Sequence, residues 1–214
     1  MSRLLPTNLR DQALSLLKLR LISGDLVPGE IYSAAGLAQE LGVSNSPVRE
    51  AMLTLVNEGL MEAVRNRGFR VVPLSDHERR NIYDIRLLLE IPAMAQLAAR
   101  RSVVEPHGKR FSALAASIVS AAGSGDIVAY LDADRQFHMG LLDLLENQHL
   151  SKIIDNLRDQ SRHYGLKRLS ESGQLVASAE EHAPILAAIL TGDEAKTARL
   201  MRDHLQHLVG DWAG

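Results

Sequence analysis

Cysteine is absent from the 214 residues, which excludes disulfide bonds, thiolate nucleophiles and cysteine-based zinc fingers. Any metal would therefore be held by histidine and carboxylate side chains. Aromatic residues make up only 4% of the chain, so aliphatic side chains must fill most of the core. No apolar run approaches the roughly 20 residues that span a membrane, and the N-terminus lacks the charged and apolar regions of a signal peptide. We therefore expect a cytoplasmic protein that does not bind membranes.

The chain also lacks a marked excess of either charge, with 24 Lys and Arg against 26 Asp and Glu. Residues 1–75 contain eight basic and seven acidic side chains, whereas the remainder contains 16 and 19. A nucleic-acid-binding protein of this composition must concentrate its positive charge locally. The length suits one large domain or two modest ones, and 46% hydrophobic residues is ordinary for a globular protein.

The most informative stretch is LGVSNSPVREAM, which runs from Leu41 to Met52. Gly42 predicts a sharp turn. The helix that follows it opens on small polar residues, with Pro47 in its first turn, where a missing N–H costs nothing. The preceding SAAGLAQEL predicts another short helix, capped by Ser33. Two short helices joined by such a turn form a helix-turn-helix, which is a DNA-binding motif.

A β-hairpin is predicted directly after this motif, because short β-prone runs flank Arg65–Gly68, with Asn66 and Gly68 at turn positions. Such a hairpin forms a wing, whose tip could reach the minor groove of DNA. Ser44 and Ser46 could instead cap their helix, and Arg49 could pair with a carboxylate. The residues expected to face DNA are Ser44, Asn45, Ser46 and Arg49 on the helix, and Arg65, Arg67 and Gly68 on the wing.

Helix is predicted throughout the rest of the chain, beyond a boundary marked by Pro73 and Ser75. The fold class that we expect is mainly α: a winged helix-turn-helix domain over 1–75 with a small β-hairpin wing, and an all-α helical bundle over 76–214. Glycine, proline and polar breaks set the helix limits. In the bundle we expect helices over 76–101, 106–123, 126–146, 149–169, 174–191 and 193–211.

Several motifs resemble those of GntR-type transcription regulators. In the first domain these are GDLVPGE, LAQELGVSNSPVREAM and LVNEGL. In the second domain, IRLLLE, DRQFH, EEHAPIL and MRDHL resemble the all-helical FCD effector domain of the FadR type, and the short linker with six helices is more similar to the VanR branch. The resemblance covers nearly the whole chain. It implies a DNA-binding homodimer that reads an inverted repeat.

Asp134 and His138 lie four residues apart on one predicted helix, so both can converge on one ion. The same spacing also occurs in plain helix-surface pairs. The resemblance implies a divalent transition metal held by Asp134, His138, His182 and His204, although His207 could compete with His204. A His₃Asp set suits zinc first, with nickel, cobalt, manganese or iron as alternatives.

An organic-acid effector is a further implication of the resemblance, bridging the metal and an arginine. Arg86 is the first candidate, because a guanidinium binds a carboxylate in a planar fork, but it could instead form a salt bridge with Glu90 one turn later. The weaker candidates are Tyr83, Asn147 and Arg162. Of these, Asn147 could instead cap the following helix.

Asn45 departs from the resemblance, because the family usually carries arginine there, and Ala35 replaces another arginine. Arginine favours guanine and asparagine favours adenine, so the operator sequence cannot be carried over. We find no general base, nucleophile motif or phosphate-binding glycine loop, and expect a regulator, more specifically a repressor, rather than an enzyme. The alternatives are a metalloenzyme-like domain fused to a DNA-binding module, and a regulator whose metal is purely structural.

Overall fold

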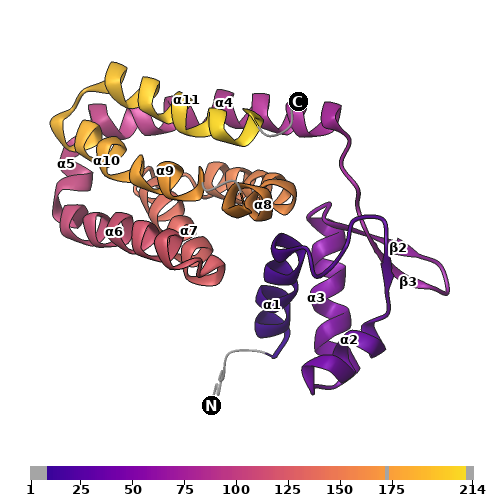
Figure 1. Ribbon diagram of the computed structural model, residues 1–214. Coiled ribbons are helices and arrows are strands. Elements are labelled where there is room, and N and C mark those ends of the chain that lie inside the picture. The colour runs from indigo at the N-terminus through magenta and orange to yellow at the C-terminus, as the bar shows by residue number, and fades with distance from the viewer. Residues whose placement is uncertain (1–8, 172–173, 211–214) are drawn as a thin grey trace, which may run out of the picture. The chain divides into compact units, whose positions relative to one another are not determined.

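The chain folds into two compact units, Met1–Ser75 and Asp76–Gly214, in the computed structural model shown in Figure 1. The structure describes the backbone of residues 9–171 and 174–210, and their side chains except those of 162–171 and 207–210. Among these residues, no helix is both long and apolar enough to cross a membrane.

Three helices and a small sheet make up the first unit. A single core holds them together, built from aliphatic side chains and Phe69, with Leu17, Val48, Met52 and Leu55 fully buried. The elements are α1 (Leu9–Ser23), β1 (Ile31–Tyr32), α2 (Ala34–Leu41), α3 (Asn45–Asn57), β2 (Met61–Val64) and β3 (Gly68–Val71).

The turn between α2 and α3 forms as its sequence predicts. Ser33 caps α2, because its Oγ accepts a hydrogen bond of 3.0 Å from the amide of Gly36. Gly42 ends α2 in the left-handed conformation with φ of 66°, where its amide donates to the carbonyls of Ala38 and Gln39. The predicted helix-turn-helix is therefore present, with α3 as its second helix.

The predicted hairpin is present, but the sheet has a third strand that the sequence pattern did not indicate. The strand order is β1-β3-β2, and both pairs are antiparallel. Two-residue β1 is too short to show any periodicity. The pairing of β1 with β3 explains why residue 68 is glycine. Its φ is +127°, and an added Cβ would lie 2.4 Å from the carbonyl oxygen of Tyr32 in β1.

The second unit is entirely helical in the part that the structure describes. Figure 1 shows α11 running beside α4, and these two helices share the most extensive contact of the unit. Helices α6 and α7 form the next largest contact, and α8 packs on α4. The elements are α4 (Asp76–Ala99), α5 (Arg101–Val104), the 3₁₀ turn η1 (Glu105–His107), α6 (Gly108–Ser124), α7 (Ile127–Asp143), α8 (Gln148–Glu171), α9 (Gln174–Glu180), α10 (His182–Thr191) and α11 (Glu194–Gly210).

The single helix expected over 174–191 is wrong, because the structure breaks it at Glu181 into α9 and α10. Pro184 explains the break. It has no N–H to donate to the carbonyl four residues earlier, and its ring would clash with that carbonyl in a continuous helix. The break places His182 at the start of a new helix, within the core of the bundle.

Candidate metal centre and nucleic-acid interface

Four side chains that the sequence analysis grouped meet inside the bundle. Asp134 and His138 come from one face of α7, His182 begins α10, and His204 lies on α11. All four are buried, and one potential ligand atom from each lies within 4.8 Å of the others. The structure thus brings together, from three helices, residues up to 70 positions apart.

The ligand atoms are spaced as they would be around one metal ion. His138 Nε2 lies 3.1 Å from His182 Nε2, which is 3.2 Å from Asp134 Oδ1. The third separation, from His138 Nε2 to Asp134 Oδ1, is 3.7 Å. Nitrogen and oxygen ligands about 2.0–2.2 Å from zinc lie about 3.0–3.5 Å from one another in tetrahedral geometry. Asp134, His138 and His182 are thus spaced close to the ligands of one ion, and His204 offers a fourth ligand atom within 4.8 Å of theirs.

Hydrogen bonds outside the cluster orient two of the imidazoles. His182 Nδ1 donates to the carbonyl of Ala179 at 2.9 Å, and His204 Nδ1 donates to Glu181 Oε2 at 2.8 Å. Since a carbonyl and a carboxylate can only accept, the proton lies on Nδ1 and the lone pair on Nε2 faces the cluster. This arrangement is usual for metal-bound histidine. Among the described residues, His138 Nδ1 has no such partner.

The imidazoles of His138 and His204 are neutral near pH 7. Burial lowers the pKa of His138 well below its usual range, and the nearby guanidinium of Arg158 lowers it further. Burial also lowers the pKa of His204 to about 4, although the hydrogen bond to Glu181 opposes the shift. Phe137 contributes to this dry environment, with its ring edge-on to His138 and His182. Neutral imidazoles with free lone pairs are metal ligands.

A chain of buried charges adjoins the cluster. Its Arg86–Glu90 pair is the alternative that the sequence offered, whereas the links through Arg158 were not predicted. Arg158 Nη2 donates to Asp134 Oδ2 at 2.7 Å, and its Nη1 donates to Glu90 Oε2 at 3.0 Å. Arg86 donates from Nε to Glu90 Oε1 at 2.5 Å and from Nη1 to Ser161 Oγ at 2.8 Å. Burial would raise the pKa of Glu90, but the two guanidiniums outweigh it and hold that pKa below its usual range.

The predicted effector residues do not all lie together. Arg86 forms the salt bridge with Glu90 that was its alternative role. Tyr83 is buried on the same helix, and burial raises the pKa of its hydroxyl. The side chain of Arg162 lies outside the described residues.

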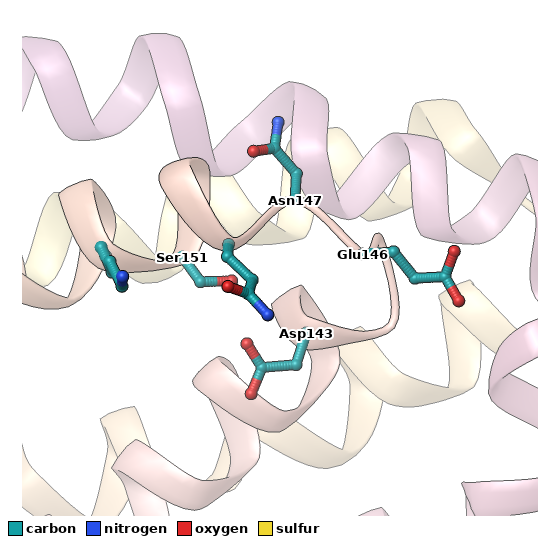
Figure 2. A pocket seen from close by; sticks show the side chains of 6 residues that line it. Asp143, Glu146, Asn147 and Ser151 are labelled. Atoms are coloured by element: carbon teal, nitrogen blue, oxygen red, sulfur yellow. The ribbon is translucent and has the colours of Figure 1, made fainter.

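Asn147 lies at the turn between α7 and α8. Its Oδ1 accepts from the amide of Leu150 at 3.1 Å, so it caps α8. It also lines a separate pocket of about 460 Å³, where its side chain points away from that of Asp143 (Figure 2). None of the four clustered side chains lines this pocket, whose lining residues are Asp143, Glu146, Asn147, Gln148, Ser151 and Lys152.

In the first unit, the residues expected to face DNA on α3 are all exposed. Ser44 occupies the N-cap of α3 but makes no capping hydrogen bond with its side chain, and Ser46 Oγ donates to Glu50 at 3.3 Å. Arg49 has no side-chain partner among the described residues, so the expected alternative of a carboxylate pair is not formed. The exposed residues expected to face DNA here are Ser44 at the N-cap and Asn45, Ser46 and Arg49 within α3.

The wing presents two more guanidiniums that no described residue engages. Arg65 and Arg67 are exposed on either side of Asn66, which turns the chain with φ of 59°. Arg70, further along β3, is instead paired with Glu62 at 2.8 Å. Exposed cations at a hairpin tip and at a helix N-terminus suit contacts with phosphates and base edges.

Comparison with known proteins gives two family matches that together span most of the chain. Residues 9–71 match "Bacterial regulatory proteins, gntR family", and residues 81–207 match "FCD domain". The HTH-type transcriptional regulator YdhC of Bacillus subtilis is 26% identical over 94% of this chain and 90% of its own. The gluconate operon transcriptional repressor of Bacillus licheniformis is 31% identical over 79% and 68%. The solved structure of E. coli McbR/YncC is 25% identical, with a TM-score of 0.83 over 97% of this chain and 98% of its own.

Proposed function

Because the chain belongs to the GntR family of bacterial transcriptional regulators and carries an FCD domain, we propose that it is a homodimeric repressor controlled by a small carboxylate bound beside a divalent metal. The family consists of DNA-binding regulators and not of enzymes. Two gluconate operon relatives, from two Bacillus species, are named as repressors. The convergence of Asp134, His138, His182 and His204 is the observation that supports the control mechanism.

The DNA-binding part of the proposal rests on the first unit. Asn45 and Arg49 on α3 would face the major groove, with Ser44 and Ser46 beside them at phosphates or base edges. The wing would place Arg65 and Arg67 against the minor groove or backbone, and Gly68 would allow the close turn. A twofold dimer of such units reads an inverted repeat.

An exposed apolar stripe on α4 supports the homodimer. Leu88 is 73% exposed and Ile85 is 44% exposed, and the two side chains lie three residues apart on one helix face. Two large apolar side chains exposed on one helix face offer an apolar surface that another chain can cover. We assign this face of α4 to the contact between protomers.

Asp134, His138, His182 and His204 would hold the metal, with zinc as the first candidate and nickel, manganese, cobalt or iron as alternatives. The bound ion would supply a Lewis-acidic centre with coordination positions that a carboxylate can fill. His204 and His182 are oriented for this by their outer hydrogen bonds, and Arg158 fixes the carboxylate of Asp134.

Charge explains why the effector would be an anion. Without metal, the buried set of Arg86, Arg158, Glu90 and Asp134 is neutral. A divalent ion adds two positive charges, and the partly exposed Glu181 would offset one of them. Uncompensated charge inside a protein is costly, so an effector carboxylate at the metal would restore neutrality.

Two of the candidate effector residues fit this position. Arg86 has a further nitrogen, Nη2, that no described residue engages, and Tyr83 lies one turn before it on the same helix. Asn147 and Arg162 remain candidates for a longer effector. Asn147 is less favoured, because it caps α8 and lines the separate pocket.

Metal analysis of tag-free protein tests the metal site. We expect about one divalent ion per chain in the wild type, and little or none in His138→Ala/His182→Ala. His107→Ala/His149→Ala is the matched control, since it removes two exposed imidazoles and should keep the ion. Equal metal content in all three proteins would reject the site.

Thermal unfolding with a panel of small carboxylates tests the effector. A ligand that binds the folded state raises the melting temperature by mass action, and we expect at least one acid to do so only in the metal-loaded protein. If metal raises the melting temperature but no carboxylate adds to it, the metal is structural and the effector proposal fails.

A further inference from the structure

Arg158 connects the metal cluster to α4. Its side chain is 3% exposed, and two of its three nitrogens are committed to carboxylates on different helices, Asp134 on α7 and Glu90 on α4. Glu90 is fully buried and is held in turn by Arg86. Ser161 closes the arrangement, because its Oγ accepts from Arg86 and donates to the carbonyl of Arg158.

Asp134 uses its two oxygens for different partners. Oδ2 accepts from Arg158, whereas Oδ1 lies among the ring nitrogens of His182 and His138. A guanidinium that holds one oxygen leaves the carboxylate a single oxygen for a metal, and it fixes the plane of the group. Arg158 therefore sets the orientation of the Asp134 carboxylate and determines which of its oxygens can bind the ion.

We propose that Arg158 is the positioning residue of the metal centre. Through its ion pair with Glu90, the affinity for metal depends on the position of α4 relative to α7 and α8. The inference rests on the proposed metal site. A residue on α4 that touches none of the four ligands, Glu90, thereby sets the affinity for the ion. The dependence is reciprocal by thermodynamic linkage, so bound metal also favours the α4 position in which this ion pair is intact.

This dependence gives the metal centre a route toward the DNA-binding unit. Helix α4 begins at Asp76, the residue that follows that unit directly in the chain. Glu90 and Arg86 lie within the same uninterrupted helix, together with the exposed Ile85 and Leu88. A change at Asp134 would therefore act on a helix that carries both the connection to the first unit and the proposed contact between protomers.

Three variants separate positioning from general stability. Arg158→Lys keeps the charge, but one ammonium cannot span two carboxylates as the guanidinium does. Glu90→Gln keeps the shape of the side chain and removes its negative charge. The positive charge of Arg158 is then balanced by Asp134 alone, and it disfavours a bound cation. Arg135→Gln is the matched control, because Arg135 neighbours Asp134 and pairs α7 with Asp155 of α8 without touching a ligand.

Zinc affinity and the visible absorption of the cobalt-loaded protein are measured at a temperature where every variant is folded. We expect Arg158→Lys and Glu90→Gln to lower zinc affinity about 10- to 100-fold, as loss of outer partners of metal ligands usually does. We also expect the cobalt spectrum of Arg158→Lys to change as Asp134 is released from single-oxygen coordination. Arg135→Gln should match the wild type in both.

The outcomes distinguish this inference from the proposed function. If the wild type takes up no metal, the proposed metal site itself fails and the inference with it. If the wild type binds zinc and both Arg158→Lys and Glu90→Gln bind it equally well with an unchanged cobalt spectrum, only the positioning role is overturned. Loss of folding stability without a change in affinity or spectrum would likewise assign Arg158 and Glu90 to the core alone.

Discussion

Asn45 stands at the first position of α3, exposed and without a side-chain partner in the described part of the chain. An asparagine there can make paired hydrogen bonds to adenine, whereas an arginine would make them to guanine. The fold of the motif is the same in either case, because α3 is held by the buried Val48, Met52 and Leu55 on its other face. We therefore expect a substitution at position 45 to change the preferred operator sequence without changing the helix.

Arg49 is the residue of α3 whose loss should weaken DNA binding most. Its guanidinium is exposed and unpaired within the described residues, so no compensating bond is released when it is removed. We expect Arg49→Ala to lower operator affinity by about 1–3 kcal/mol in a gel-shift titration at fixed salt. Arg100→Ala removes another exposed arginine, from the second unit, and it should leave operator affinity unchanged. Equal affinities in all three proteins would contradict the assignment.

The residues of the metal cluster differ in how far the sequence reveals them. Asp134 and His138 are visible from their spacing on one helix, and His182 and His204 from the family resemblance. Glu90 is visible only as a possible partner of Arg86 one turn away. Arg158 carries no such signal, because its partners Glu90 and Asp134 lie 68 and 24 residues away. Contacts of that separation depend on how α4, α7 and α8 pack, and single residues in a helical pattern do not encode it.

At the scale of elements, the sequence predicts helices and turns well where neighbouring residues alone determine them. The capped helix and the glycine turn follow from Ser33 and Gly42, because each acts on its own neighbours. The strand β1 and the break at Glu181 were missed for different reasons. β1 exists only because β3 pairs with it. The break was signalled by Pro184, but the apolar pattern over 174–191 continues through it.

Gly68 gives the wing a test of its own. Its φ of +127° is costly for any residue with a Cβ, and that Cβ would lie 2.4 Å from the carbonyl oxygen of Tyr32. We expect Gly68→Ala to reduce the free energy of unfolding of the first unit by about 2 kcal/mol or more, measured by urea denaturation. Gly123→Ala is the contrasting control, since α6 has open space there, and alanine should leave stability unchanged or raise it by about 0.5–1 kcal/mol. Equal stability of the two variants would contradict the requirement for glycine at position 68.

At the scale of the whole molecule, the two units divide the charge and the chemistry between them. Among the described residues of the first unit, the exposed cations lie on α3 and at the wing tip, against a nearly balanced total charge. The second unit contains all four clustered side chains and the buried ion pairs. The chain passes from the first unit into the second at the start of α4.

This division predicts where metal stabilises the chain. Zinc at 100 times its dissociation constant should stabilise the second unit by about 2.7 kcal/mol, because every proposed ligand lies there. In hydrogen exchange of chelator-treated protein with and without zinc, protection should rise in α4, α7, α10 and α11. Helix α1, which contributes no ligand, should exchange as before. In His138→Ala/His182→Ala, zinc should change neither unit. A rise confined to α1–α3, or a rise that persists in the double variant, would place the metal elsewhere in the molecule.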